Sequence, residues 1–540
     1  MTNNPNTTHK RRSLIAGGLT SSAGIFISKA IGILYVMPFK ALATDQNIAY
    51  YSYGYTLYDV ALQITIAGIP VAIAMLIAKY YARDDMATVL MIRKIGRYML
   101  LFLGIFSMLF VFLFASPLAR LIITENVSES AIYYTSNIFK IIAFAMLIIP
   151  VLGSYRAFFQ GLKIMETYSF SQVLEQFVRV GFLLGTGYVL VVLFRYDPIW
   201  AVYMAILAAS ISGLVALVHL HFKEKPLVDE IKANVETAPL ATRMILREIV
   251  YFSIPYLLVS VLGKSSSFVN LAFYNRAIFM ISDNEKLIDL IFGMIMFTTQ
   301  KIISIPAVLA LGFSAAVIPY VSEAITTNNH ASLKRNINDA ISSVLYLAIP
   351  ISAGIMFFAT PIYYLFYTDN FELGGRVLFH AASGGLALAL TPVTTVILTV
   401  ANLRRRVIKN LFVSFIFHAL IFFPMVLLLG YQGVIHASYF AHYLVIILNL
   451  TVLKRVYKVS YQPFLRSGLL MLLSGLIFLV LRQVTVWLQV PFIVSGRWWT
   501  LFYLSVFGLI GVILYGALTW FLQLPQTIFK IDSLRDIIRR

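Results

Sequence analysis

The sequence predicts an all-α integral membrane protein with about 14 transmembrane helices, in two six-helix lobes related by an internal repeat, plus two extra C-terminal helices. The prediction rests on composition, on a series of long apolar stretches and on landmarks that recur at nearly constant spacing. Hydrophobic residues make up 60% of the 540 residues and charged residues 12%, against roughly 45–50% and 25% in soluble globular chains. These proportions exclude a disordered chain, a secreted disulfide scaffold and a cytosolic enzyme. The absence of cysteine also excludes a thiolate nucleophile.

A transmembrane helix needs about 20 mostly apolar residues. The first candidate follows a basic N-terminus, but it is longer than a signal-peptide core and no small-residue cleavage site follows, so we interpret it as a span. The predicted spans are 14–38, 52–80, 95–117, 131–155, 168–193, 199–221, 249–274, 290–321, 338–360, 376–400, 408–429, 433–453, 466–482 and 498–522.

The loops between these spans are short, and none is long enough for a soluble catalytic domain. The longest, 222–248, is polar and basic, and we predict that it is a cytoplasmic linker between the lobes. The predicted parts are therefore an N-lobe at 1–221, a C-lobe at 249–453, the two extra helices at 454–522 and a cytoplasmic tail at 523–540. The tail mixes apolar and charged residues, as an interfacial helix does.

The distribution of basic residues predicts the orientation. Of the 42 Lys and Arg residues, 29 fall on the N-terminal side of the predicted membrane, 8 on the opposite side and 5 within spans. Cytoplasmic loops carry the excess of Lys and Arg, so both termini are expected in the cytoplasm. This bias also accounts for most of the net charge of +19, so the charge does not indicate a nucleic-acid partner.

Three landmarks of the first lobe recur in the second, which predicts a duplication. Both lobes start on the same side, so the repeat is parallel, about an axis normal to the membrane. Binding at the interface between two equivalent lobes is a recurrent plan among transporters. The landmarks, at offsets of 235, 236 and 242, are Lys29 and Lys264, Pro70 and Pro306, and Pro150 and Pro392.

Charged residues inside the spans are the candidate functional residues. Each costs at least about 2.5–3.5 kcal/mol at the bilayer centre, so each needs a reason. Lys29, Lys264 and Lys301 have small or polar neighbours at helical spacing, and we predict that they line a cavity, whereas Lys140 suits snorkelling. The alternative for Lys29 is a structural pairing. The acidic cases are Asp59, which could pair with any of these lysines, and Glu175, whose i,i+4 spacing from Arg179 predicts a structural pair.

A positively charged cavity predicts an anionic substrate. Low-dielectric walls strengthen the field of the lysines, and the compact ammonium of Lys binds phosphate well. A cation exporter would be expected to show carboxylates there. The sequence therefore favours a phosphate-bearing substrate.

Other chemistry has little support in the sequence. The eight His residues show no metal-ligand spacing, and there is no phosphate-binding G-x-x-x-x-G-K-[ST] loop and no G-x-S-x-G nucleophile motif. We expect no enzymatic activity, no metal and no cofactor, and coupling to the membrane potential or to a monovalent ion stays open.

Several short motifs resemble those of the MurJ/SpoVB/YtgP-type lipid flippases, a polysaccharide biosynthesis branch of the MATE-like multidrug/oligosaccharidyl-lipid/polysaccharide exporter superfamily. Ser28-Lys29-Ala30-Ile31-Gly32 resembles the family's S-[RK]-x-x-G signature in span 1. The segments at 160–162 and 171–180 look like its spans 4–5, and 305–324 looks like its span 8. The order and spacing of these motifs, over nearly the whole chain, give the resemblance its specificity.

The resemblance implies transport of lipid II, the undecaprenyl-diphosphate-linked peptidoglycan precursor, from the inner to the outer leaflet. It implies a cationic cavity between two lobes and a groove for the lipid tail at helices 13 and 14. The family's basic residues in spans 1 and 8 map to Lys29 and Lys301. The chain departs from the family at Tyr35 and near Gln63, where many members have basic residues, and at Ser304, where they have Glu.

The sequence thus predicts a flippase of the bacterial plasma membrane that works by alternating access. Its substrate-binding residues would be Lys29, Lys264, Lys301, Asp59 and Gln63, while the four prolines of the repeat would let helices bend. Expected partners are the lipid substrate, membrane lipids and proteins of cell-wall synthesis and division. The alternatives are a flippase for another polysaccharide or teichoic acid lipid intermediate, a multidrug antiporter, and a non-transporting membrane scaffold.

Overall fold

The structure is a computed structural model, and every element that it describes is helical. Gln63 lies in a described helix, but its side chain is not described, and Lys29 lies outside the described residues. The described residues are 31–32, 35–66, 68–81, 83–122, 129–162, 164–233, 240–307, 321, 329–401, 403–458, 462–493 and 496–529.

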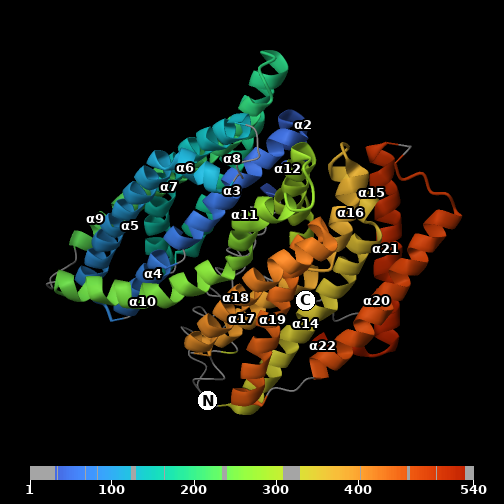
Figure 1. The fold of residues 1–540 in the computed structure, drawn as a ribbon. Coiled ribbons are helices and arrows are strands. Elements are labelled where there is room, and N and C mark those ends of the chain that lie inside the picture. Colours follow the sequence, from blue (N-terminus) through green and yellow to red (C-terminus); the bar gives the residue numbers. More distant parts are fainter. Residues whose placement is uncertain are drawn as a thin grey trace. The chain divides into compact units, whose positions relative to one another are not determined.

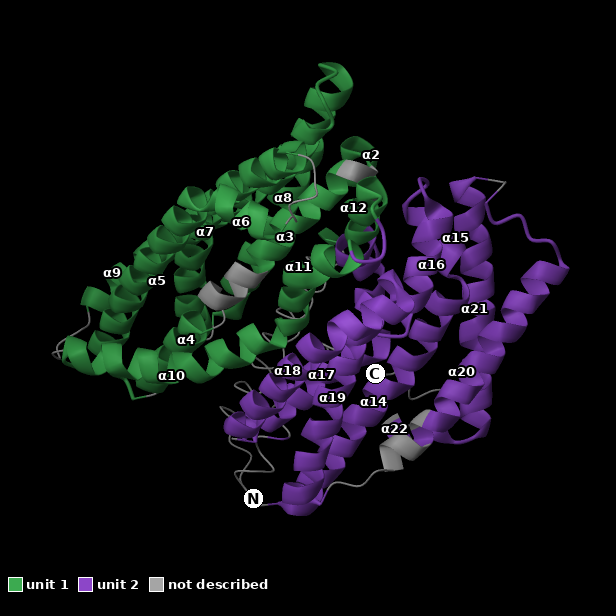
Figure 2. Ribbon diagram, in the orientation of Figure 1, with its two compact units in different colours: residues 1–279, 283–293 green, residues 280–282, 294–540 purple. Residues whose placement is uncertain are grey.

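The chain divides into two compact units, coloured separately in Figure 2. Unit 1 comprises residues 1–279 and 283–293, and unit 2 comprises residues 280–282 and 294–540. The chain passes from one unit to the other within a continuous helical run, Glu285–Ala307. The helices of unit 1 (Figure 1) are α2 (Val36–Ala43), α3 (Asp45–Ile66), α4 (Ile69–Tyr81), α5 (Met86–Leu113), α6 (Ala115–Ile122), α7 (Glu129–Gly161), α8 (Met165–Tyr188), η1 (Val189–Leu193), α9 (Ile199–Ala233), α10 (Thr242–Gly263), α11 (Ser265–Ile278) and α12 (Glu285–Gly293).

Helix α7 forms the centre of unit 1, where it packs against α3, α4, α5 and α9. Apolar side chains of α4, α5 and α7, such as Ile77, Val89 and Phe158, are fully buried together. Burying a large aliphatic or aromatic side chain stabilises a water-soluble fold by about 1.5–3 kcal/mol. Inside a bilayer, close packing and interhelical hydrogen bonds supply more of the stabilisation, because lipid is as apolar as leucine.

Ion pairs tie the helices of unit 1 together near one end. Glu224 of α9 is 1% exposed and lies 2.7 Å from Arg93 and 2.6 Å from Arg97, both on α5. Glu248 of α10 lies 3.0 Å from Lys79 of α4. Removing a partner of the buried Glu224 leaves an uncompensated charge, so its two ion pairs hold α9 against α5, while the partly exposed Lys79–Glu248 pair links α10 to α4.

Unit 2 is organised around α14, which packs against α16, α17 and α20. Helices α18 and α19 form a tight antiparallel hairpin whose turn is Gly430, with φ +61° and ψ −140°, a conformation that favours glycine. The elements of unit 2 are η2 (Met294–Thr298), α14 (His330–Phe357), α15 (Ala359–Phe366), α16 (Phe371–Ala382), α17 (Gly385–Val400), α18 (Arg404–Leu429), α19 (Tyr431–Tyr457), α20 (Gln462–Trp487), α21 (Arg497–Phe521) and α22 (Leu524–Phe529).

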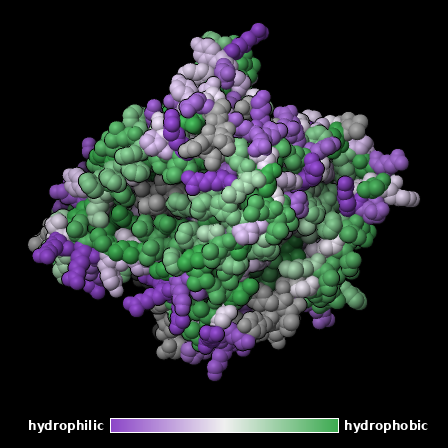
Figure 3. Space-filling model, viewed as in Figure 1, coloured by the Kyte–Doolittle hydropathy of each residue, from purple (hydrophilic) through white to green (hydrophobic). Residues whose placement is uncertain are grey.

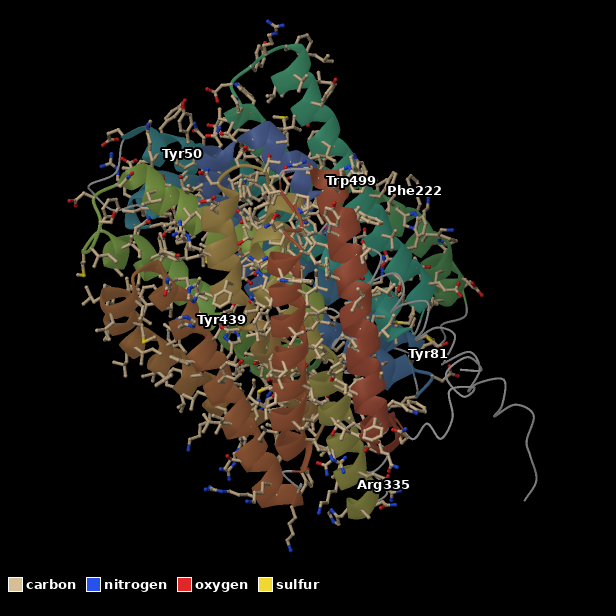
Figure 4. The ribbon with its side chains drawn as sticks, turned by 90° about the vertical axis from the view of Figure 1, so that its right-hand side faces the viewer. Tyr50, Tyr81, Phe222, Arg335, Tyr439 and Trp499 are labelled. Carbon is tan, nitrogen blue, oxygen red and sulfur yellow. The ribbon has the colours of Figure 1, made fainter. Side chains whose placement is uncertain are left out.

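Twelve described helical runs are long and apolar enough to cross a membrane, and they correspond to predicted spans 3–14. Most of span 1 and the later part of span 8 lie outside the described residues. Exposed aromatic and aliphatic side chains, among them Phe102 and Trp498, cover these helices, and Figure 3 shows hydrophobic side chains over much of one face. In Figure 4, Tyr50 and Tyr81 lie at opposite ends of unit 1, and Trp499 and Arg335 lie at opposite ends of unit 2, as the predicted alternation of spans requires.

Three spans predicted as continuous are broken in the structure. Span 2 consists of α3 and α4, and Pro70 is the second residue of α4, where its missing N–H costs no intrahelical bond. Span 7 is divided at Lys264 into α10 and α11. Span 10 is divided between α16 and α17 at Ser383 and Gly384. Hydropathy detects apolar length, but it does not detect such breaks.

Two predicted boundaries differ from the structure. The linker predicted at 222–248 is shorter, because α9 continues to Ala233 and α10 begins at Thr242. Compact packing also divides the chain later than this linker, since α10, α11 and α12 belong to unit 1. The predicted lobe boundaries themselves stay predictions. The tail predicted at 523–540 contains the short helix α22, and residues 530–540 lie outside the described part.

Each unit has its own proline–glycine contact, at the positions that the predicted repeat makes equivalent. In unit 1, a Cβ placed on Gly153 of α7 would lie 3.3 Å from Cγ of Pro70. In unit 2, a Cβ placed on Gly385 of α17 would lie 3.5 Å from Cγ of Pro306. The glycines stand at an offset of 232, close to the 236 that separates the prolines. A glycine at each site lets a proline-bearing helix approach closely.

Candidate functional site

An ion pair between Lys264 and Asp59 lies inside unit 1. Lys264 Nζ is 2.7 Å from Asp59 Oδ2, and the two side chains are 38% and 26% exposed. Charge-assisted hydrogen bonds of this length are among the stronger polar contacts in proteins. Among the described residues, the lysine that Asp59 neutralises is Lys264. This is one of the pairings that the sequence left open.

The position of Lys264 is a joint between two helices. Lys264 ends α10 and precedes α11, with φ −100° and ψ 9°. Such values belong to the sparsely populated bridge region, where many active-site residues are found. A Cβ placed on the preceding Gly263 would meet no atom within 4 Å, so the joint is open on that side.

Asp59 belongs to a tyrosine-rich stretch of α3. The rings of Tyr51 and Tyr55 stack with centroids 5.6 Å apart. Tyr55 lies within electrostatic range of Asp59, Lys264 and also Arg179 of α8. This tyrosine therefore connects the ion pair to a second group of charges.

That second group has Glu175 of α8 at its centre. Glu175 lies 3.0 Å from Arg179, the i,i+4 pair expected from the sequence, and 2.9 Å from Arg156 of α7. Arg156 also donates to the side chain and the carbonyl of Ser171, and Arg179 shares a hydrogen bond with Tyr58. All three charged side chains are less than 20% exposed.

Arg156 is a charged residue of this site that the sequence did not reveal, since the predicted topology assigned it to a cytoplasmic loop. Arg156 instead lies within a helix, because α7 continues to Gly161, while its placement on the cytoplasmic side stays a prediction. The predicted span ended one residue earlier, and no local signal marks the guanidinium as buried. Asp289 was missed for a similar reason: the helix starts at Glu285, before the predicted span, and buries this carboxylate, which accepts a hydrogen bond of 3.0 Å from Tyr53.

The two ion-paired groups together carry a surplus of one positive charge. Lys264, Arg156 and Arg179 face the carboxylates Asp59 and Glu175, and each cation is within 3.0 Å of a carboxylate oxygen. Among the described residues, Glu175 is the one carboxylate within 4 Å of both arginines, so it balances the charge of one of them. In surroundings of low dielectric constant this uncompensated charge attracts anions more strongly than it would in water.

Lys301 belongs to unit 2. Its ammonium lies 5.4 Å from the ring centroid of Phe297, and Ser304 donates a hydrogen bond of 2.8 Å to its backbone carbonyl. Its convergence with Lys29 and Lys264 stays a prediction, because Lys29 and the side chain of Gln63 are not described. Within the described ranges no three His, Asp or Glu side chains are grouped to hold a metal ion.

Four prolines were predicted to bend helices. Pro150 and Pro392 lie inside α7 and α17. Pro70 instead starts α4, just after the break in span 2, and Pro306 lies in the last described turn of the run Glu285–Ala307. The prolines thus occupy helix interiors in spans 4 and 10 and a helix start in span 2.

The chain matches a known protein family and resembles known proteins in sequence. Residues 14–325 match the family model described as polysaccharide biosynthesis protein. The chain is 25% identical over 482 residues, 88% of each sequence, to "Lipid II flippase MurJ" of Bacillus subtilis (strain 168). It is 24% identical over 68% of its length to "Uncharacterized membrane protein YabM" of the same organism, covering 66% of that protein.

Solved structures show the same fold. "Lipid II flippase MurJ, inward closed conformation" superposes with a TM-score of 0.67 at 13% identity, covering 96% of this chain and 100% of that one. An inward-facing multidrug resistance MATE family transporter of the MOP superfamily superposes with a TM-score of 0.63 at 16% identity, covering 81% of this chain and 96% of the other. The predicted fold class is confirmed.

Proposed function

This chain belongs to the family of polysaccharide biosynthesis proteins, and on that premise we propose that it is a flippase for a lipid-linked cell-wall precursor. We assign it lipid II, carried from the inner to the outer leaflet of the bacterial plasma membrane. A relative named as a lipid II flippase, which matches over 88% of the chain, supports this assignment. The shared transporter fold supports movement of a substrate through the protein rather than catalysis or a scaffolding role.

The observation that carries the proposal is the positive surplus inside unit 1. Three cations, Lys264, Arg156 and Arg179, are held by two carboxylates in or at the end of predicted spans. Maintaining surplus charge in a membrane is costly, so it indicates a function. A diphosphate matches it, because it offers several negative charges and many acceptor oxygens. A substrate that is a drug cation would be repelled.

The mechanism that we propose is alternating access. Lys29, Lys264 and Lys301 engage the diphosphate in an inward-open cavity that Asp59 and Gln63 also line, and the lobes then rock to face outward. With both termini in the cytoplasm and the inside negative, the membrane potential favours the return of a net-positive empty cavity. Its contribution is about 2.3 kcal/mol per charge per 100 mV if the full field is crossed.

The lipid tail needs an apolar path beside the cavity. We assign it to α20 and α21, whose exposed side chains are mostly aliphatic and aromatic, among them Leu472, Leu476 and Phe502. A Cβ placed on Gly475 or on Gly508 would meet no atom within 4 Å, which leaves the surface of both helices open there. Burying each CH₂ group of an acyl chain contributes about 0.8 kcal/mol.

The direct test is translocation of labelled lipid II by the purified protein in liposomes. We expect transport by the unaltered chain, and at least a tenfold loss on changing Lys29→Ala or Lys264→Met, because a hydrogen bond to a charged group contributes about 1.5–3 kcal/mol. Lys232→Met is the matched control. Lys232 is 62% exposed, and its ion pair with the exposed Asp229 is long, at 3.9 Å. Transport by Lys264→Met at the normal rate would contradict the role of Lys264.

A second candidate substrate is another lipid-linked polysaccharide or a teichoic acid intermediate. The matching family model describes polysaccharide biosynthesis in general, which favours it. Rescue of cells depleted of their lipid II flippase separates the two substrates: rescue supports lipid II, and failure together with transport of another lipid-linked glycan supports the alternative. A chain that moves no lipid in liposomes would instead be a scaffold.

A further inference from the structure

The proposed function assigns the ammonium of Lys264 to the substrate diphosphate, but this ammonium is already paired with Asp59. Asp59 Oδ2 lies 2.7 Å from Lys264 Nζ, so a substrate phosphate has to share this lysine with the carboxylate or displace it. The two residues are 205 positions apart in the sequence, and their contact links α3 to the junction between α10 and α11. A contact between such distant segments is a product of the fold and not of local chain stiffness.

The pair is also accessible. Lys264 and Asp59 are 38% and 26% exposed, whereas Glu175 is 15% exposed and Glu224 is 1% exposed in their own ion pairs. An ion pair that solvent reaches is weaker than a buried one, because water screens the attraction and can solvate either partner. An incoming anion can therefore exchange with the carboxylate.

Displacement of Asp59 from Lys264 would alter the backbone conformation, because Lys264 lies between two helices. Its φ of −100° and ψ of 9° are outside the helical range, and its N–H bonds to carbonyls of α10 while its own carbonyl accepts from Phe268 of α11. Residues at element ends absorb the dihedral changes of hinge motions. A shift of the Lys264 side chain from Asp59 to a ligand thus acts at the link between α10 and α11.

We infer that Asp59 is an internal counter-ion that competes with the substrate diphosphate for Lys264. This inference rests on the proposed function and deepens it. A diphosphate carries more negative charge than one carboxylate, so it displaces Asp59 when it binds. When the diphosphate leaves, Asp59 restores the pair, which promotes release and lowers the charge of the empty site. Asp59 thereby sets affinity and turnover without being a substrate ligand itself.

Binding of farnesyl diphosphate by the purified chain tests the inference. Asp59→Asn removes the competing carboxylate. We therefore expect the Kd of this variant for farnesyl diphosphate to fall about tenfold, within the range of couplings between interacting sites. Lys264→Met is expected to raise the Kd, and the double variant should resemble Lys264→Met, because Asp59 acts through that lysine. Asp229→Asn and Lys232→Met are matched controls on an exposed pair and should leave the Kd unchanged.

Translocation of lipid II by the same variants gives the second readout. Asp59→Asn should bind more tightly yet turn over more slowly, because release is impaired. A purely structural role would instead weaken both binding and turnover. Inorganic pyrophosphate, tested beside farnesyl diphosphate, separates recognition of the diphosphate alone from recognition of a lipid-borne one.

The outcomes are distinguishable from those of the proposed function. An unchanged or raised Kd in Asp59→Asn overturns the counter-ion role alone, while lipid II transport by the unaltered chain still supports the proposed function. Lack of farnesyl diphosphate binding in every variant overturns the diphosphate recognition on which both depend. If Asp59→Asn does not fold, Asp59→Ser removes the same carboxylate, and an unchanged or raised Kd in that folded variant also overturns the inference.

Discussion

At the scale of single residues, the positions of the carboxylates decide what the buried cations can do. Asp59 neutralises Lys264, whereas Glu175 serves both Arg156 and Arg179. One acid between two guanidinium groups leaves a positive site that keeps its structure, because each guanidinium still has an anionic neighbour. This arrangement combines stability with attraction for an anion, which an isolated buried arginine would not achieve.

Glu175→Gln should therefore destabilise the protein more than removal of either arginine. Without the carboxylate, two guanidiniums face each other uncompensated, and breaking a buried ion pair in this way costs about 3–5 kcal/mol. Arg156→Met leaves the neutral pair Glu175–Arg179, so it should cost less stability while lowering transport, because the surplus charge is gone. Thermal unfolding in detergent, measured beside transport, separates the two effects.

The control for this comparison is Glu129→Gln. Glu129 and its partner Arg120 are 83% and 65% exposed and 3.8 Å apart, and pairs of this kind are worth about 0–1 kcal/mol. Its Tm should stay close to that of the unaltered chain. If Arg156→Met proves as destabilising as Glu175→Gln, the surplus charge does not reside where we place it.

At the scale of helices, breaks in the spans and close helix–helix contacts shape the structure more than the helix propensity of the residues does. The interruptions of spans 2, 7 and 10 fall beside Pro70, at Lys264 and at Gly384. Each places irregular backbone within a predicted span, which membrane proteins tolerate where the backbone is packed in protein or lines a cavity. In span 7, the break coincides with Lys264, the lysine that the proposed function assigns to the diphosphate.

The hairpin of α18 and α19 supplies a sharp test of close packing. A Cβ on Gly433 would lie 2.0 Å from the backbone oxygen of Met425, which no side-chain rotation can relieve. Gly433→Ala should therefore destabilise unit 2 by about 1–3 kcal/mol or more. Gly508→Ala in α21, whose Cβ would meet no atom within 4 Å, should be neutral or slightly stabilising. Equal melting temperatures of the two variants would contradict the packing described.

At the scale of the whole molecule, the repeat and the compact units divide the chain differently. The proline–glycine contacts, Pro70 with Gly153 and Pro306 with Gly385, follow the repeat. The compact units instead place α10, α11 and α12 with the first half of the chain. Duplication sets the pattern of spans, whereas packing sets which helices are held together, so the two divisions need not coincide.

A split protein tests this difference. Co-expressed fragments 1–236 and 237–540, cut between α9 and α10, should co-purify, because α10 packs on α4 and α5 and Glu248 bonds Lys79. Fragments that purify separately would show that α10 is not held by the first part of the chain. A reporter on each terminus, read from both sides of the membrane, checks the expected cytoplasmic location of both ends.

The sequence by itself determined the fold class, nearly all of the described spans and the candidate cations other than Arg156. These are local properties, because hydropathy over about 20 residues and a charge within an apolar run can be read without any contact. The equal spacing of Pro70 and Pro306, and the i,i+4 spacing of Glu175 and Arg179, were visible in the same way.

Only the tertiary structure decided which charges meet. Asp59 and Lys264 are separated by 205 residues, and Arg156 reaches Glu175 from another helix. Periodicity could not select these partners, because many arrangements of helices satisfy the same apolar pattern. The break at Lys264 also depends on the fold, since the local sequence favours a continuous span. Long-range packing thus converted a list of buried charges into two ion-paired groups with one positive charge in surplus.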